Sequence, residues 1–95
     1  MISPDTRFRQ KEGLLSQRAA DTRVLLDPAD GNYFALDDVS GRIWDLCDGD
    51  RTVAQVVETL CAEYDAPQET VEPDVMEFLG EMLTEGLVIE QSGQP

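Results

Sequence analysis

The sequence contains no histidine and only two cysteines, Cys47 and Cys61, among its 95 residues. Histidine is the commonest general base near neutral pH, so its absence removes the usual centre of acid–base catalysis. The two cysteines form no CxxC pair, so a metal site would have to be built from two thiols and carboxylates. We therefore expect a chain that is not an enzyme and holds no metal or cofactor, with both cysteines acting as small core side chains.

Basic residues are also scarce, with seven Lys and Arg against 20 Asp and Glu and a net charge of −13. No basic residue follows Arg51, whereas acidic residues continue to Glu90. Such a surface repels phosphate backbones and anionic lipid headgroups. The composition therefore argues against direct binding to nucleic acid or to a membrane.

Long hydrophobic runs are missing as well. No apolar run approaches the roughly 20 residues needed to span a bilayer, and the N-terminal MISPDTRFRQKEG has no apolar core of a secretory signal. We therefore expect a cytoplasmic protein with one small domain. Residues 1–13 are assigned to an N-terminal arm or first edge strand, residues 14–90 to the folded domain and residues 91–95 to a disordered tail.

The clearest local signal is a strand that runs directly into a helix. The turn dipeptide Asp30-Gly31 precedes Asn32–Leu36, a segment rich in β-forming residues. Asp37 or Asp38 can then accept hydrogen bonds from the first free amides of a helix. This junction fixes the angle between a small sheet and a helical layer.

Two earlier segments, Leu14–Arg18 and Thr22–Asp27, are predicted to be strands that complete a three-stranded antiparallel sheet. In the second of them Val24 and Leu26 share one face and Leu25 points to the other. We assign the face of Val24 and Leu26 to the core.

Three helices follow in the expected order. The first carries an apolar stripe and ends near Gly49; the stripe consists of Val39, Ile43, Leu46 and Cys47. A capping box at Thr52 and Gln55 begins the second helix, and the intervening DGDR is predicted to be a tight turn, as in a helix-turn-helix.

The third helix is predicted to begin near Thr70, because Pro73 is tolerated only in the first turn of a helix. Gly86 ends the helix, and Leu87–Ile89 is a short strand or tail. The expected fold class is therefore α+β and winged helix-turn-helix-like, with a three-stranded antiparallel sheet followed by three helices.

Several short motifs occur together in a specific order. They are the aromatic pair Tyr33-Phe34 in the third strand, the pair Ile43-Trp44, the DGDRTV run at Asp48–Val53, and DVMEFL at Asp74–Leu79 with Gly86-Leu87 after it. In this order the chain resembles the PqqD family, whose members recognise the leader segment of ribosomally made, post-translationally modified peptides. Within the family it is most similar to the stand-alone proteins of lasso-peptide clusters.

The resemblance implies that the leader adds as a strand to the edge of Asn32–Leu36 and lies against the third helix, without any reaction on this chain. The peptide-binding residues it implies are Val24, Leu25, Leu26, Asn32, Tyr33, Phe34, Ala35, Leu36, Asp74, Val75, Glu77, Phe78, Leu79, Glu81 and Met82. The implied partners are a precursor leader, a leader-removing cysteine protease and a macrocyclase.

Several alternatives remain open at this point. One is a PqqD-type chaperone that presents the precursor of pyrroloquinoline quinone to a radical-SAM enzyme. Another is a winged-helix transcription regulator, although the segment Thr52–Tyr64, which would read DNA, contains no Lys or Arg. An enzyme and a generic acidic adaptor are further possibilities. The acidic column Asp74, Glu77, Glu81 and Glu85 is either a solvated face or an acidic lip for a basic partner.

Overall fold

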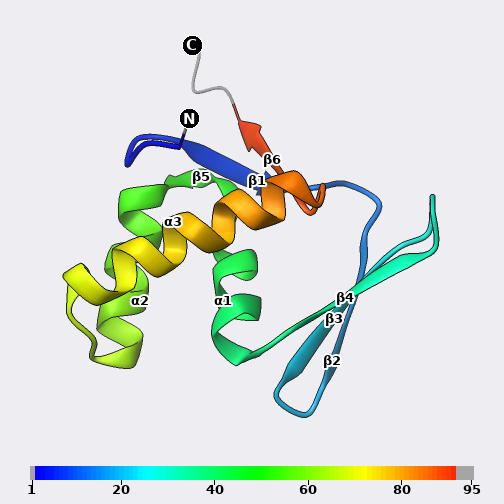
Figure 1. The fold of residues 1–95 in the computed structure, drawn as a ribbon, viewed down its shortest axis with the longest axis horizontal. Coiled ribbons are helices and arrows are strands. Elements are labelled where there is room, and N and C mark those ends of the chain that lie inside the picture. Colours follow the sequence, from blue (N-terminus) through cyan, green and yellow to red (C-terminus); the bar gives the residue numbers. More distant parts are fainter. Residues whose placement is uncertain (1, 92–95) are drawn as a thin grey trace.

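The computed structural model describes residues 2–91, which fold into two three-stranded antiparallel sheets and three helices (Figure 1). The strands are β1 (Arg7–Gln10), β2 (Leu15–Ala19), β3 (Thr22–Asp27), β4 (Asn32–Leu36), β5 (Asp48–Thr52) and β6 (Val88–Gln91). The helices are α1 (Asp38–Leu46), α2 (Val53–Tyr64) and α3 (Gln68–Thr84). None of these helices is long and apolar enough to cross a membrane. The architecture is α+β, as predicted, but it contains one sheet more than expected.

The first sheet has the order β2-β3-β4 and confirms the predicted antiparallel hairpins. Its last strand has the predicted bounds, and Leu25 of β3 lies opposite Phe34 of β4. The turn between these strands closes with a 2.8 Å hydrogen bond from the Gly31 amide to the Asp27 carbonyl. Gly31 has φ +76°, a backbone conformation that favours glycine.

The second sheet has the order β5-β1-β6 and was not predicted. In place of the arm or edge strand expected for residues 1–13, β1 is the central strand of this sheet. The prediction of a tight DGDR turn between the first two helices is wrong, because this segment forms β5, which pairs with β1. Gln91, expected in the tail, belongs to β6, and residues 92–95 lie outside the described residues.

The N-terminal end of α1 agrees with the sequence prediction, and its C-terminal end does not. Asp37 caps the helix as predicted, since its carboxylate accepts a 2.8 Å hydrogen bond from the Ser40 amide. The helix ends at Leu46, with Cys47 and not Gly49 at its C-cap. Gly49 lies within β5 with φ +87°, and a Cβ there would be 3.5 Å from the Cβ of Arg9 on β1. Gly49 therefore allows the backbone conformation of β5 beside β1 and does not cap the helix.

The boundaries of the other two helices follow their caps. Thr52 and Gln55 form the predicted capping box at the start of α2. The helix α3 begins at Gln68, two residues before the start expected near Thr70, with Pro67 at the N-cap, and the expected position of Pro73 in the first turn is wrong. Pro73 consequently lies beyond the first turn, where its ring nitrogen has no hydrogen to donate.

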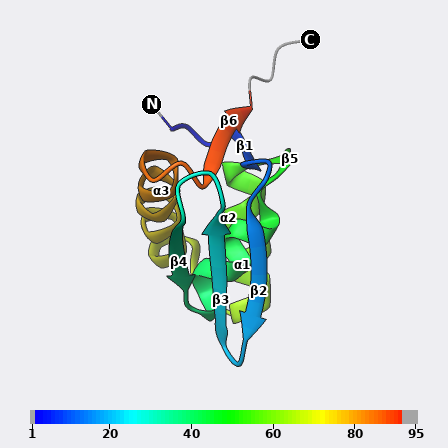
Figure 2. The same ribbon diagram turned by 90° about the vertical axis from the view of Figure 1, so that its right-hand side faces the viewer.

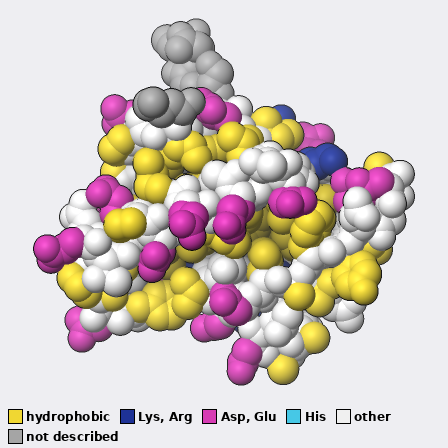
Figure 3. All heavy atoms as spheres, viewed as in Figure 1, with side chains coloured by type: hydrophobic (Ala, Val, Ile, Leu, Met, Phe, Trp, Pro, Cys, Tyr) yellow, Lys and Arg dark blue, Asp and Glu magenta, His cyan; other side chains and the backbone are white. Residues whose placement is uncertain are grey.

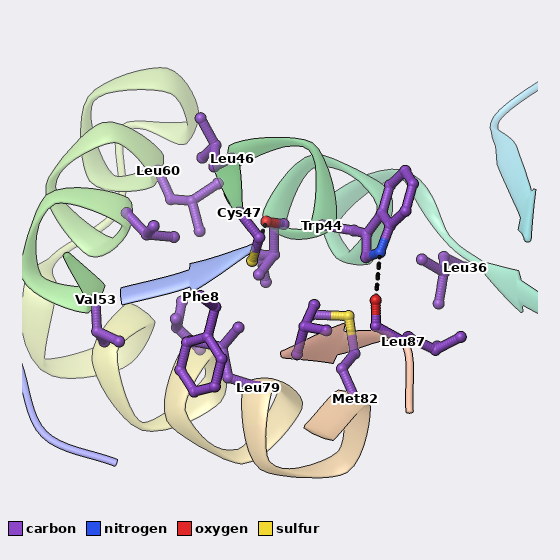
Figure 4. Packing of buried hydrophobic residues seen from close by; sticks show 14 of the residues in the cluster. Phe8, Leu36, Trp44, Leu46, Cys47, Val53, Leu60, Leu79, Met82 and Leu87 are labelled. Atoms are coloured by element: carbon purple, nitrogen blue, oxygen red, sulfur yellow. Dashed lines mark hydrogen bonds between the residues drawn. The ribbon is translucent and has the colours of Figure 1, made fainter. Parts of the chain in front are cut away.

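The core lies where the helices meet the inner faces of both sheets (Figure 4). In β3 the predicted assignment of faces is wrong, since Leu25 is fully buried while Val24 and Leu26 are only half-buried. The inward position of Leu25 follows from its register opposite Phe34, which also contacts the core. The core side chains are Phe8, Leu25, Leu36, Ile43, Trp44, Leu46, Cys47, Val53, Val56, Val57, Leu60, Val75, Leu79, Met82, Leu87 and Val88.

An ion pair connects the segment after β1 to the end of β3. Lys11 Nζ lies 2.8 Å from a carboxylate oxygen of Asp27, which is 9% exposed and also accepts a hydrogen bond from the Ala29 amide. The hydrogen bond from Lys11 lowers the pKa of Asp27 below its usual 3.8. Ionised Asp27 therefore stabilises the fold above that value, and the contribution is lost as the pH falls through the lowered pKa.

We expect Asp27→Asn to lower the free energy of unfolding near neutral pH and to have a smaller effect in acid. The difference from the parent protein should narrow as the pH falls below about 4 and through the lowered pKa of Asp27, because Asp27 of the parent then becomes protonated. Urea denaturation across this range measures the difference. Asp21→Asn is the matched control, because it removes the same charge from the exposed β2–β3 turn and from a side chain that none of the described ion pairs includes, so it should leave the free energy of unfolding near neutral pH unchanged.

Candidate functional site: a groove between β4 and α3

A groove of about 370 Å³ separates the β4 edge of the first sheet from the C-terminal half of α3. Figure 2 shows the sheet face-on, with α3 at the side of the sheet where β4 lies and away from β2. The residues that line the groove are Tyr33, Phe34, Ala35, Leu36, Phe78, Glu81, Met82, Glu85 and Leu87. Strand and helix therefore supply opposite walls of one hollow.

The β4 wall is a free strand edge. Within residues 2–91, β4 pairs only with β3, so its second edge has no strand beside it. Such an edge presents backbone amides and carbonyls that need hydrogen-bonding partners. The other free edge of this sheet belongs to β2, where every residue is exposed and no helix stands opposite. Of the two free edges that this sheet has within residues 2–91, the β4 edge is the one beside the apolar groove.

The bottom of the groove is apolar and well packed. Leu36, Met82 and Leu87 are each buried to more than nine-tenths, and Phe34 and Phe78 are half-buried against the core. Long flexible Met and planar Phe side chains adapt well to an incoming apolar group. The arrangement can hold one or two large hydrophobic side chains of a partner.

Trp44 of α1 fixes the floor of this groove from below. Its indole Nε1 donates a 3.2 Å hydrogen bond to the carbonyl of Leu87, in the connection between α3 and β6 (Figure 4). The carbonyl of Trp44 accepts a 3.0 Å hydrogen bond from the side chain of Gln10. Three elements that are distant in sequence are thus held together beneath the groove.

Arg23 attaches the sheet to the helical part of the molecule. Its guanidinium makes two hydrogen bonds to the Asp45 carboxylate, at 2.6 and 2.8 Å, and lies 5.9 Å from the centre of the Trp44 ring. The hydrogen bonds that Arg23 donates to Asp45 raise the pKa of Arg23. Gly41 allows this close approach, because a Cβ at that position would lie 3.2 Å from the Cβ of Arg23. These contacts hold β3 against α1.

The charges at the groove are acidic. Glu81 and Glu85 line it, and a neighbouring hollow on α3 is lined by both of them together with Glu77. In the space-filling view, acidic side chains follow one another along α3, beside the hydrophobic side chains of the groove (Figure 3). The described ion pairs involve Arg9, Lys11, Arg23, Arg42 and Arg51, and none of them includes a carboxylate of α3.

Seven of the predicted site residues lie together in the groove: Tyr33, Phe34, Ala35, Leu36, Phe78, Glu81 and Met82. Leu25, Val75 and Leu79 do not line it, because they are fully buried in the core. Val24 and Leu26 lie on the outer face of the sheet, and Asn32, Asp74 and Glu77 lie outside the lining. Leu87 was not predicted, and Glu85 was predicted only as a member of the acidic column and not among the peptide-binding residues.

The two thiols have different surroundings. Cys47 is buried, donates to the Ile43 carbonyl and has its pKa raised to about 12 by burial. Cys61 is half-buried on α2. Over the described part of the chain, no group of three His, Cys, Asp or Glu side chains is placed to hold a metal ion.

Comparisons with known proteins agree with each other. The family model described as "Coenzyme PQQ synthesis protein D (PqqD)" matches residues 22–88. A PqqA binding protein of Xanthomonas axonopodis pv. citri is 37% identical over 79 residues, which cover 81% of this chain and 84% of that protein. A PqqA binding protein of Rhodopseudomonas palustris is 36% identical over 67 residues, which cover 70% of this chain and 64% of that protein.

Solved structures extend the similarity to nearly the whole chain. TbiB1, in complex with the TbiA(β) leader peptide, has a TM-score of 0.74 and 32% identity, covering 92% of this chain and 98% of TbiB1. The PqqD truncation of Methylobacterium extorquens PqqCD, described as a stand-alone recognition element for ribosomally synthesised and modified peptides, has a TM-score of 0.76 and 27% identity. This structural match covers 94% of this chain and 95% of that truncation. By its family match and its curated relatives, the chain belongs to the PqqD family.

Proposed function

We propose that this protein captures the leader segment of a ribosomally made precursor peptide by strand addition to β4, without catalysing a reaction itself. The single observation that carries the proposal is the free edge of β4, which faces an apolar groove against α3. An added strand satisfies the backbone groups of that edge whatever its sequence is. Selectivity then comes from the side chains that enter the groove.

The known relatives support this proposal. The curated relatives are named PqqA binding proteins, and the TbiB1 structure contains a leader peptide. In this chain the proposed contacts are the β4 backbone, the apolar side chains Phe34, Phe78 and Met82, and the exposed ring of Tyr33. Capture would raise the local concentration of the precursor beside an enzyme supplied by another chain.

The enzyme partner is proposed on the similarity alone. A lasso-peptide role would supply a leader-removing cysteine protease and a macrocyclase, and the sequence motifs that resemble the stand-alone proteins of lasso-peptide clusters favour it. A role in pyrroloquinoline quinone synthesis would supply a radical-SAM enzyme, and the PqqA binding proteins at up to 39% identity favour it equally. Titration calorimetry with the precursor encoded beside this chain distinguishes the two pathways. A winged-helix regulator is disfavoured, because α2 carries no Lys or Arg.

We expect backbone N-methylation of the leader to reveal the strand addition directly. Methyl groups placed one at a time along the leader should weaken binding by about tenfold or more at every second residue and little at the residues between. The period of two arises because alternate amides of a strand point toward its neighbour. Fluorescence polarisation with labelled peptides measures the series, and the side-chain sequence stays constant throughout, so each peptide controls for the next. A uniform response along the leader would contradict strand addition.

A further inference from the structure

Two carboxylates on α3 and a third at its C-cap, Glu85, occur at a constant helical spacing beside the groove. Glu77, Glu81 and Glu85 are each four residues apart, so they follow one another at intervals of about 6 Å along the helix axis. The last turn of α3 contains no basic residue that would balance its carbonyl end. Like charges at this spacing disfavour the helix slightly. The arrangement is therefore a small cost to the free protein.

An independent observation connects two of these carboxylates with a ligand site. Glu81 and Glu85 line the same hollow as the free β4 edge and the apolar side chains Phe78 and Met82. Neither glutamate takes part in an ion pair among the described residues. The groove thus combines a backbone edge, an apolar floor and an acidic rim.

We propose that Glu81 and Glu85 make the groove selective for leaders with basic side chains at alternate positions, a specificity that depends on the strand addition proposed above. An extended peptide rises about 6.7 Å every two residues, which matches the interval of about 6 Å between carboxylates one helical turn apart. Residues i and i+2 also point to the same face of a strand. One face of the bound peptide therefore meets both carboxylates at once.

The chemistry of Lys and Arg suits both parts of the groove. Their aliphatic stems pack on apolar surface such as Phe78 and Met82, while the charged ends reach the rim. The seven basic residues of this chain lie at or before Arg51, and none of the ion pairs within residues 2–91 includes a carboxylate of α3, so the rim is open to a cation from elsewhere. The same carboxylates would repel the acidic side chains of a negatively charged peptide.

The test uses a displayed library of random peptides of roughly 12 residues, selected on the whole chain. The parent protein should enrich Lys and Arg at i, i+2 spacing, and Glu81→Gln/Glu85→Gln should not. A selected peptide should bind the double variant about three- to tenfold more weakly, because each exposed ion pair contributes modestly. Raising the salt from about 50 to 500 mM should reduce this difference.

The matched control is Glu58→Gln/Glu69→Gln, which removes the same charge from exposed positions outside the groove and should select the same basic peptides as the parent. If the parent and the groove variant enrich the same uncharged peptides, and these compete with the leader, the charge selectivity is overturned while leader capture stands. If no selected peptide competes with the leader, leader capture in this groove and its charge selectivity fail together.

Discussion

Replacing Phe78 with alanine is expected to weaken leader binding by about 30-fold. Phe78 is a half-buried aromatic side chain on α3 that lines the groove opposite the free edge of β4. Aromatic anchors of this kind contribute about 2 kcal/mol or more at the centre of an interface, and 1.4 kcal/mol corresponds to a tenfold change in the dissociation constant. Fluorescence polarisation with a labelled leader measures the loss.

Two companion variants make this result specific. Leu83→Ala removes an apolar side chain that is 38% exposed on the same helix but does not line the groove, so it should leave affinity unchanged. Tyr33 is 72% exposed, so Tyr33→Ala should lower affinity by about fivefold without lowering the melting temperature. Parent-like affinity in both Phe78→Ala and Tyr33→Ala would place the binding site elsewhere on the molecule.

The largest expected loss of stability comes from Leu25→Ala. Leu25 is fully buried between the sheet and the helices, and Leu→Ala at such positions lowers the free energy of unfolding by about 3 kcal/mol. Against a total of about 5–15 kcal/mol for a domain, this is a large fraction. Urea denaturation followed by far-ultraviolet circular dichroism gives the value.

The neighbouring residue provides the control, because Leu26→Ala removes the same atoms from the outer face of the same strand. Leu26 is half-buried, so its replacement should lower the free energy of unfolding by no more than about 1 kcal/mol. If Leu26→Ala proved the more damaging, the core would lie on the face that the sequence pattern first suggested, and the register of β3 against β4 would be wrong.

The pattern of β3 explains why its faces were misassigned. The segment TRVLLD has apolar residues on both faces, so alternation alone cannot choose between Leu25 and its neighbours. The choice is made by register, since Leu25 lies opposite Phe34 in the next strand. Where the signal was local, as in the Asp37 cap and the Thr52–Gln55 capping box, the sequence sufficed.

The second sheet could not be predicted because its strands are short and its partners are distant. Arg7 of β1 lies opposite Thr52 on one side and Gln91 on the other, so neither pairing leaves a local trace. The DGDR segment has turn residues, and its Asp48 carboxylate does accept hydrogen bonds from two nearby amides. The pairing with β1 nevertheless makes this segment a strand.

The groove was predictable to the extent that one face of α3 could be identified. The apolar residues of this helix point in two directions: Val75 and Leu79 are buried in the core, while Phe78 reaches the groove. Sequence periodicity merges these two sets into one stripe. Leu87 was missed because its role depends on the hydrogen bond from Trp44, more than 40 residues earlier.

The pairing of Arg7 with Gln91 has a consequence for how this domain can be joined to other proteins. The beginning of β1 and the end of β6 lie side by side in the second sheet, and the groove is built from other elements (Figure 1). A catalytic domain tethered by a short linker at either end would leave the β4 edge accessible. Such a fusion could therefore hold a substrate tail and act on it within a single polypeptide.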